Sequence, residues 1–270
     1  MNMMIKKVTV LLFSSFLLVD ASSASAQDTY ADSVVSYIPG MGISSYYTNA
    51  SAALGAPDPT ASIIAPAYGT TNIVGVGVGG ELTVAFSVPI TNNAVAHADG
   101  MDFTIFGNEF FILSESTISG IYDHAGLTVW VSQDDENFYQ LIAPESLSYG
   151  VDELYPTDGR GNACLPISPL LSLTNFTGDT AAQALSLYDG SAGGTSYSIS
   201  WAENTNGSPE DLLSVSYVKV EGGTNYGYVD AISRVENVPE PSELALLFIG
   251  VGIMLCYRKR RLHVCRNFPQ

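Results

Sequence analysis

The sequence predicts an all-β protein built as an antiparallel sandwich, and three observations support this. Short β-branched and aromatic runs recur along the central part of the chain, separated by Gly, Asp and Asn. Apolar and polar residues alternate in residues 82–86, as in a strand with one buried face. A sustained 3.6-residue periodicity is scarce, and no internal repeat of fixed period occurs. Such a pattern favours antiparallel sheets, and we expect a jelly roll.

The expected elements follow one another along the chain. The strands are residues 82–86, 103–106, 127–131, 139–142, 196–201, 215–220 and 228–235. The helix candidate is residues 180–187, with Asp179 as its N-cap. The glycine-rich run at residues 75–80 leads into a strand rather than a helix, so it does not predict a phosphate-binding loop. We expect a flexible loop or a hairpin connection there.

The N-terminal residues have the three parts of a secretory signal peptide. Lys6 and Lys7 supply the charged region, and residues 8–19 supply an apolar region too short for a comfortable membrane span. Small residues follow at positions 24–26. The sequence therefore predicts a signal peptide over residues 1–26, with cleavage between Ala26 and Gln27.

The C-terminal part has a second targeting signal, which consists of three parts. It begins with a proline-flanked motif at residues 238–242, made of Val238, Pro239, Glu240, Pro241 and Ser242. An apolar span at 244–257 follows, which as a helix would be roughly 21 Å long, and then a basic cluster at 258–261. The two prolines end the folded domain, and the basic residues are expected to stay cytoplasmic. A tail at 262–270 completes the chain.

This order of motif, apolar span and basic cluster resembles the PEP-CTERM sorting signal of Gram-negative bacteria. The resemblance implies processing by an exosortase-type enzyme after signal peptidase has acted. It also implies a transient inner-membrane anchor and a destination at the cell surface or in the exopolysaccharide matrix. An ordinary single-pass tail is the alternative.

The β-sandwich ectodomain is expected at residues 27–237, and it is strongly acidic. It contains 24 acidic residues and three basic ones, which gives a net charge near −21. Nucleic acid and anionic lipid are poor partners for this surface, because phosphate binding needs clustered Lys and Arg. Divalent cations and neutral or cationic glycans are compatible with it, although the charge can also serve solubility alone. Cys164 is the one ectodomain cysteine, so no internal disulfide is expected, and we interpret it as a buried thiol.

Several ordered segments resemble bacterial surface proteins with a galactose-binding-like, discoidin-type sandwich. The segments are residues 53–58, 79–86, 102–109, 129–138, 209–212 and 229–232. The resemblance implies a jelly roll, often with glycan binding or without an assigned activity. Gly107 stands where an acidic residue is common in this pattern, which puts the transfer of a ligand role in doubt.

Carboxylates around these segments are candidates for a structural calcium site. Calcium prefers six to eight oxygen ligands, which loops beside a strand can supply. A jelly roll brings its two ends together, so residues from both halves are included. The candidates are Asp99, Asp102, Glu109, Asp211 and Asp230. The alternative is that these acids cap turns or lie solvated on loops.

Tyrosines on expected loops are candidates for sugar contacts, because pyranose rings stack on exposed aromatic faces. We select Tyr46, Tyr122 and Tyr226. Trp130 and Trp201 fall in expected strands and are interpreted as core residues.

Two function classes follow from these observations. The first is a noncatalytic surface or matrix protein with weak glycan affinity and a structural calcium ion. The alternative is a secreted polysaccharide hydrolase that uses paired carboxylates as acid and base. No serine-nucleophile motif, histidine cluster or zinc-ligand spacing occurs in the sequence, which favours the noncatalytic class.

Overall fold

The protein was examined as a computed structural model that describes residues 29–123, 126–144 and 155–237. The predicted cleavage site at Ala26 and Gln27 lies outside the described residues. The sorting motif at Val238, Pro239, Glu240 and Pro241 also lies outside them, as do the apolar span and the basic cluster that follow. Within the described ranges, no helix is long and apolar enough to cross a membrane.

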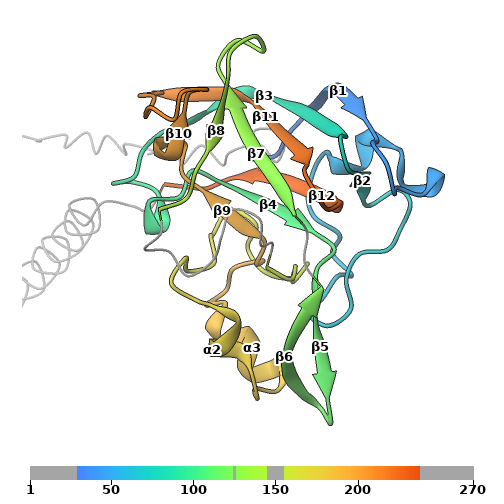
Figure 1. Cartoon of the computed structure of the whole chain (residues 1–270). Helices are drawn as coiled ribbons and strands as arrows, with labels where there is room; N and C mark the ends of the chain where they lie inside the picture. Colours follow the sequence, from blue (N-terminus) through green and yellow to red (C-terminus); the bar gives the residue numbers. More distant parts are fainter. Residues whose placement is uncertain (1–28, 124–125, 145–154, 238–270) are drawn as a thin grey trace, which may run out of the picture.

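Two antiparallel sheets form the body of the domain (Figure 1). The six-stranded sheet has the order β1 (Ser33–Ile38), β3 (Glu81–Thr91), β11 (Ser214–Gly222), β7 (Leu127–Ser132), β8 (Phe138–Leu141) and β10 (Ala202–Glu203). The four-stranded sheet has the order β2 (Val74–Val76), β12 (Gly227–Arg234), β4 (Phe103–Gly107) and β9 (Thr195–Tyr197). The predicted all-β, antiparallel class is confirmed.

The main hydrophobic core lies between these two sheets. The six-stranded sheet contributes Val84, Val131 and Val218, and the four-stranded sheet contributes Ile105 and Val229. These side chains are at most 1% exposed. Each full burial of such a side chain stabilises the fold by about 1.5–3 kcal/mol, so packing between the sheets holds the sandwich together.

A separate hairpin, β5 (Phe110–Ser114) and β6 (Thr117–Asp123), projects from the sandwich beside two short helices (Figure 1). The helices are α2 (Leu173–Phe176) and α3 (Ala181–Leu187). Phe111 of the hairpin packs on Phe176 of α2 with ring centroids 5.0 Å apart. A second apolar cluster therefore attaches this hairpin and the helices to each other.

Two local predictions were wrong. Thr180, not Asp179, is the N-cap of α3, because its hydroxyl accepts from the Gln183 N–H while the Gln183 side chain accepts from the Thr180 N–H. The strand expected at residues 196–201 ends at Tyr197. A 3₁₀ turn, η4 (Ile199–Trp201), follows, with the Ser198 hydroxyl as its cap accepting from the Ser200 N–H.

The glycine-rich run is also more ordered than expected, because Gly75 belongs to β2 and Gly77 packs tightly against a neighbouring segment. The Gly77 N–H donates to the Pro39 carbonyl at 2.7 Å. A Cβ atom on Gly77 would lie 2.2 Å from the Met41 carbonyl oxygen. Glycine is therefore required here for close backbone approach, not for flexibility.

Candidate functional site

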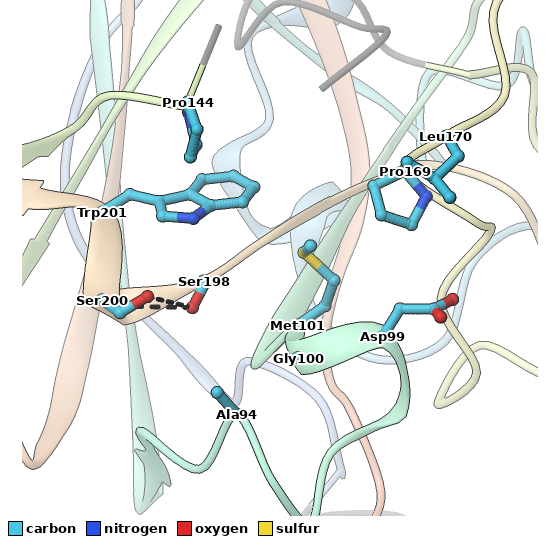
Figure 2. A pocket seen from close by; sticks show the side chains of 10 residues that line it. All are labelled: Ala94, Asp99, Gly100, Met101, Pro144, Pro169, Leu170, Ser198, Ser200 and Trp201. Atoms are coloured by element: carbon cyan, nitrogen blue, oxygen red, sulfur yellow. Dashed lines mark hydrogen bonds between the residues drawn. The ribbon is translucent and has the colours of Figure 1, made fainter. Parts of the chain in front are cut away.

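A pocket of about 340 Å³ lies where several loops meet at one end of the sandwich (Figure 2). The loop after β3 and the short turn η3 (Ala98–Gly100) form one wall, and η4 forms another. Segments that follow β8 and precede α2 complete it. The lining residues are Ala94, Asp99, Gly100, Met101, Pro144, Pro169, Leu170, Ser198, Ser200 and Trp201.

The lining combines an aromatic ring, hydroxyl groups and one carboxylate. Figure 2 shows the Trp201 indole and the Asp99 carboxylate toward opposite ends, with Met101 between them. The hydroxyls of Ser198 and Ser200 are 2.8 Å apart below the indole in this view. Among the ten described lining residues, Asp99 is the only charged one. The pocket therefore offers an apolar surface with a few polar groups, which is the usual character of a small-molecule site.

Asp102 connects the two walls of this pocket. Its Oδ1 accepts from the Asn93 N–H at 3.1 Å and contacts His97 Nδ1 at 2.7 Å. Its Oδ2 accepts from the Ile199 N–H at 2.7 Å and from the Ser198 hydroxyl at 3.4 Å. Since Asp102 is fully buried and its oxygens are used in these bonds, it is a positioning residue for both walls.

Asp99 is held outward by an unusual backbone conformation. Its φ is 54°, in the left-handed region, and the φ of the following Gly100 is 71°. Aspartate tolerates this region better than most residues, and glycine adopts it freely. The pair makes the sharp turn of η3, which leaves the Asp99 carboxylate exposed at the pocket.

A second group of carboxylates is buried beside β12. The Asp58 N–H donates to both carboxylate oxygens of Asp230, at 2.9 and 3.2 Å. Burial raises the pKa of Asp230 to about 7, and the nearby Asp58 charge adds to this effect. Burial opposes ionisation of Asp58 as well. Its hydrogen bonds from Thr60 and Asn72 outweigh that cost and hold its pKa below the ordinary value.

Glu109 is also buried, and its side chain fills the space above Gly107. A Cβ atom added to Gly107 would lie 2.2 Å from Glu109 Oε2 and 2.7 Å from the Tyr228 carbonyl oxygen. A larger residue at position 107 would therefore displace the Glu109 side chain. Gly107 stands where the galactose-binding-like pattern commonly has an acidic residue. In this protein the Glu109 side chain occupies the space that a side chain at position 107 would need.

The five candidate calcium ligands do not form one cluster. Asp99 and Asp211 are exposed, whereas Asp102 and Asp230 are buried in different networks. The Asp102 carbonyl accepts from the Val235 N–H, and Val235 is five residues beyond Asp230, roughly 16 Å along an extended strand. One ion with ligand distances of about 2.3–2.6 Å cannot reach both carboxylates. In the described ranges, no three His, Cys, Asp or Glu residues are grouped so as to hold a metal ion.

The candidate tyrosines are distributed over different parts of the fold. Tyr46 and Tyr226 are 75% and 51% exposed. Tyr226 packs edge-on against Tyr228 with centroids 6.0 Å apart, and Tyr228 contacts Tyr47 at 5.3 Å. Tyr122 belongs to β6, and its side chain is outside the described set.

The tyrosine cluster of Tyr47, Tyr226 and Tyr228 is remote from the pocket. Tyr228 is the second residue of β12, and Val235, which bonds to Asp102, lies just past its end. The seven intervening steps span roughly 23 Å in an extended strand. These tyrosines and Trp201 therefore cannot contact the same sugar ring.

Trp201 was missed as a surface residue because the expected strand placed it in the core. It is half-buried, packs on the core and also faces the pocket. In the sequence, Ser198 and Ser200 could have indicated a turn in place of the strand, since serine commonly begins a turn with a side-chain cap. Cys164 is buried as expected, and burial together with nearby Glu236 raises the pKa of its thiol to about 12.

The pocket and the buried Asp58–Asp230 pair are thus two candidate sites within the described residues. The first is open and chemically mixed, whereas the second is closed. No protein-family model matches the chain, and no curated protein matches it.

Proposed function

We propose that this protein is an exported, noncatalytic glycan-binding protein of the cell surface or extracellular matrix, and that the pocket beside Trp201 is its sugar site. The observation that carries the proposal is the set of groups in the pocket: one indole, two serine hydroxyls and one carboxylate. The antiparallel sandwich supports a jelly-roll, galactose-binding-like assignment within this proposal.

The chemistry of a pyranose ring matches this lining. The C–H face of a sugar stacks on an indole, and its hydroxyls need donors and acceptors at the edge. Ser200 and Asp99 are exposed and can exchange hydrogen bonds with such hydroxyls. The volume of about 340 Å³ lies at the lower end of small-molecule sites, so one or two sugar units fit better than a long chain segment.

The expected signal peptide and the PEP-CTERM-like sorting signal support the export part of the proposal. Signal peptidase and an exosortase-type enzyme are the expected processing partners. The last described residue, Asn237, forms an isolated β-bridge with His97, whose loop carries Asp99. The described part of the chain therefore ends beside the loop that carries Asp99. An extracellular polysaccharide is the expected ligand class.

One observation favours the hydrolase alternative. Asp58 and Asp230 are in contact, and their pKa values are shifted in opposite directions, as in a pair of general acid and base. However, Asp58 is 7% exposed and Asp230 is 2% exposed. The Asp58 oxygens are occupied by Thr60 and Asn72. A buried and internally bonded pair gives a polysaccharide no access, so we favour binding without turnover.

Calcium is kept as a separate proposal, supported by the acidic ectodomain rather than by a gathered ligand set. A structural ion binds the native state and must raise its apparent stability. Thermal melting with and without EDTA tests this. A lower midpoint in EDTA supports an ion, and an unchanged midpoint removes it.

The sugar site is tested by binding of polysaccharides to the full-length protein in mild detergent. Trp201→Ala is expected to weaken binding about five- to 150-fold, because stacking of a ligand ring on one aromatic side chain contributes about 1–3 kcal/mol. Trp130→Ala is the matched control, since Trp130 lies on β7 beside Lys219 and is not among the residues that line the pocket. Far-UV circular dichroism and the melting midpoint confirm that each variant is folded.

Two outcomes would contradict the proposal. Equal loss in both variants would assign the effect to stability rather than to contact. Release of reducing sugar by the wild type, abolished in Asp230→Asn, would replace it with the hydrolase alternative.

A further inference from the structure

We propose that the pocket selects a cationic sugar, namely a glycan that carries a free amino group, and that Asp99 is the residue that selects it. This rests on the proposed sugar site. It adds the charge of the bound sugar, which stacking on Trp201 and hydrogen bonds to the serine hydroxyls do not determine.

The charge of the lining is the first argument. Among the described lining residues, Asp99 is the only charged side chain, and its carboxylate is exposed at the end of the pocket away from the indole (Figure 2). A sugar stacked on Trp201 can extend a substituent past Met101 toward this carboxylate. A protonated amine is the substituent that a carboxylate binds best, because the hydrogen bond is charge-assisted.

The second argument is the aromatic ring at the other end of the same pocket. An indole attracts cations through its face, in addition to stacking on apolar C–H groups. Both ends of the pocket therefore favour a positive ligand over a neutral one, and both disfavour an acidic sugar. The ectodomain charge near −21 acts in the same direction at long range.

Bulk acidity alone would attract any polycation, so the local role of Asp99 needs a matched control. Asp189 provides one, because it is also exposed, has a φ of 48° and is followed by a glycine with positive φ, Gly190. It lies after α3 and is not among the residues that line the pocket. Asparagine tolerates the left-handed region as aspartate does, so Asp99→Asn and Asp189→Asn remove one charge from equivalent turns.

The experiment compares glucosamine oligomers with the same oligomers after N-acetylation, using the full-length protein in detergent. The wild type is expected to bind the amino form more tightly. Asp99→Asn should weaken binding of the amino form about two- to fivefold, the upper part of the range for an exposed ion pair. It should leave the acetylated form unchanged, and Asp189→Asn should leave both unchanged. The preference should decrease in high salt, because exposed charges are screened.

The outcomes separate this inference from the proposed function. If both oligomers bind equally well and Trp201→Ala weakens both, the sugar site stands and selection by Asp99 is overturned. If Asp99→Asn and Asp189→Asn weaken the amino form equally, the preference comes from overall charge, which also overturns it. Oligolysine of equal charge tests the amine without a sugar ring, and binding as tight as that of the glucosamine oligomer would overturn selection of a sugar. If neither oligomer binds, selection of an amino sugar is overturned, whereas the sugar site itself is overturned only if polysaccharides also fail to bind the wild type.

Discussion

The backbone N–H of Asp58 donates to both carboxylate oxygens of Asp230, at 2.9 and 3.2 Å, in the buried region beside β12. Asp230 lies at a bulge, where the register of β12 against β4 shifts between Val229 and Ala231. The bulge orients the Asp230 side chain into a packed region, where the alternation of a regular β-strand would place an apolar side chain. The two carboxylates then share one buried environment, and the proton on Asp230 becomes part of the folded state.

The first prediction is that stability decreases as pH rises through the acidic range. The pKa of Asp230 is about 7 in the folded protein against 3.8 as its ordinary value. The folded state therefore binds one more proton than the unfolded state between these values, and ∂ΔG of unfolding with pH is negative there. The decrease amounts to roughly 4 kcal/mol at most for this group, is complete near pH 7 and stays constant above it. Urea unfolding at several pH values measures it.

Asp230→Asn is the test variant for this titration. Its amide oxygen can still accept from the Asp58 N–H, and it carries no charge at any pH. We expect the variant to be more stable than the wild type at about pH 8 and to lose the decrease between pH 4 and 7. Asp58 and Asp32, whose pKa values are lowered, still cause a loss of stability as pH falls toward and below their ordinary pKa values. An unchanged slope in Asp230→Asn would contradict the assignment.

A second prediction concerns two neighbouring glycines at the end of β11. A Cβ atom on Gly222 would lie 2.0 Å from the Gly77 carbonyl oxygen, whereas a Cβ atom on Gly223 has no atom within 4 Å. Gly222→Ala is expected to destabilise the fold by about 1–3 kcal/mol, because backbone must move to accommodate the methyl group. Gly223→Ala is expected to stay within about 0.5 kcal/mol of the wild type. Equal denaturation midpoints for the two variants would contradict the close contact.

Most of the sandwich could be predicted from the sequence, because the alternating runs that became β3, β7 and β11 have strong period-2 patterns. Short elements such as β2 and β10 depend on contacts with distant segments, so their own residues carry little signal. The site was harder to predict for the same reason. Asp99 and Asp102 were selected as metal ligands, but the fold uses one to line a pocket and the other to join its walls.

A third prediction follows from the corrected N-cap of α3. The Thr180 hydroxyl accepts from the Gln183 N–H, and the Gln183 side chain accepts from the Thr180 N–H at 2.9 Å. Thr180→Ala is expected to cost about 0.5–2 kcal/mol, because it leaves a helix N–H without its acceptor. Asp179→Ala, one residue earlier, should cost clearly less, since the hydrogen bonds of Asp179 to Ile118 and Phe176 are made by its backbone and remain in the variant. A larger loss in Asp179→Ala would restore the cap expected from the sequence.

The last prediction separates two carboxylates that were candidates for the same calcium site. Asp102 is fully buried and accepts from the N–H groups of Asn93 and Ile199, while Asp211 is exposed. Asp102→Asn places an amide donor against one of these donors, so a buried N–H loses its acceptor. We expect a loss of about 1–3 kcal/mol in urea unfolding, since a buried N–H that is left without an acceptor costs this much. Glycan binding should weaken as well, because the loop that carries Asp99 loses its link to Trp201. Asp211→Asn should change stability by less than about 0.5 kcal/mol. The contrary outcome is that both variants are equally destabilised and that EDTA lowers the stability of the wild type to the same level. A shared ion, rather than this hydrogen-bond network, would then explain the role of Asp102.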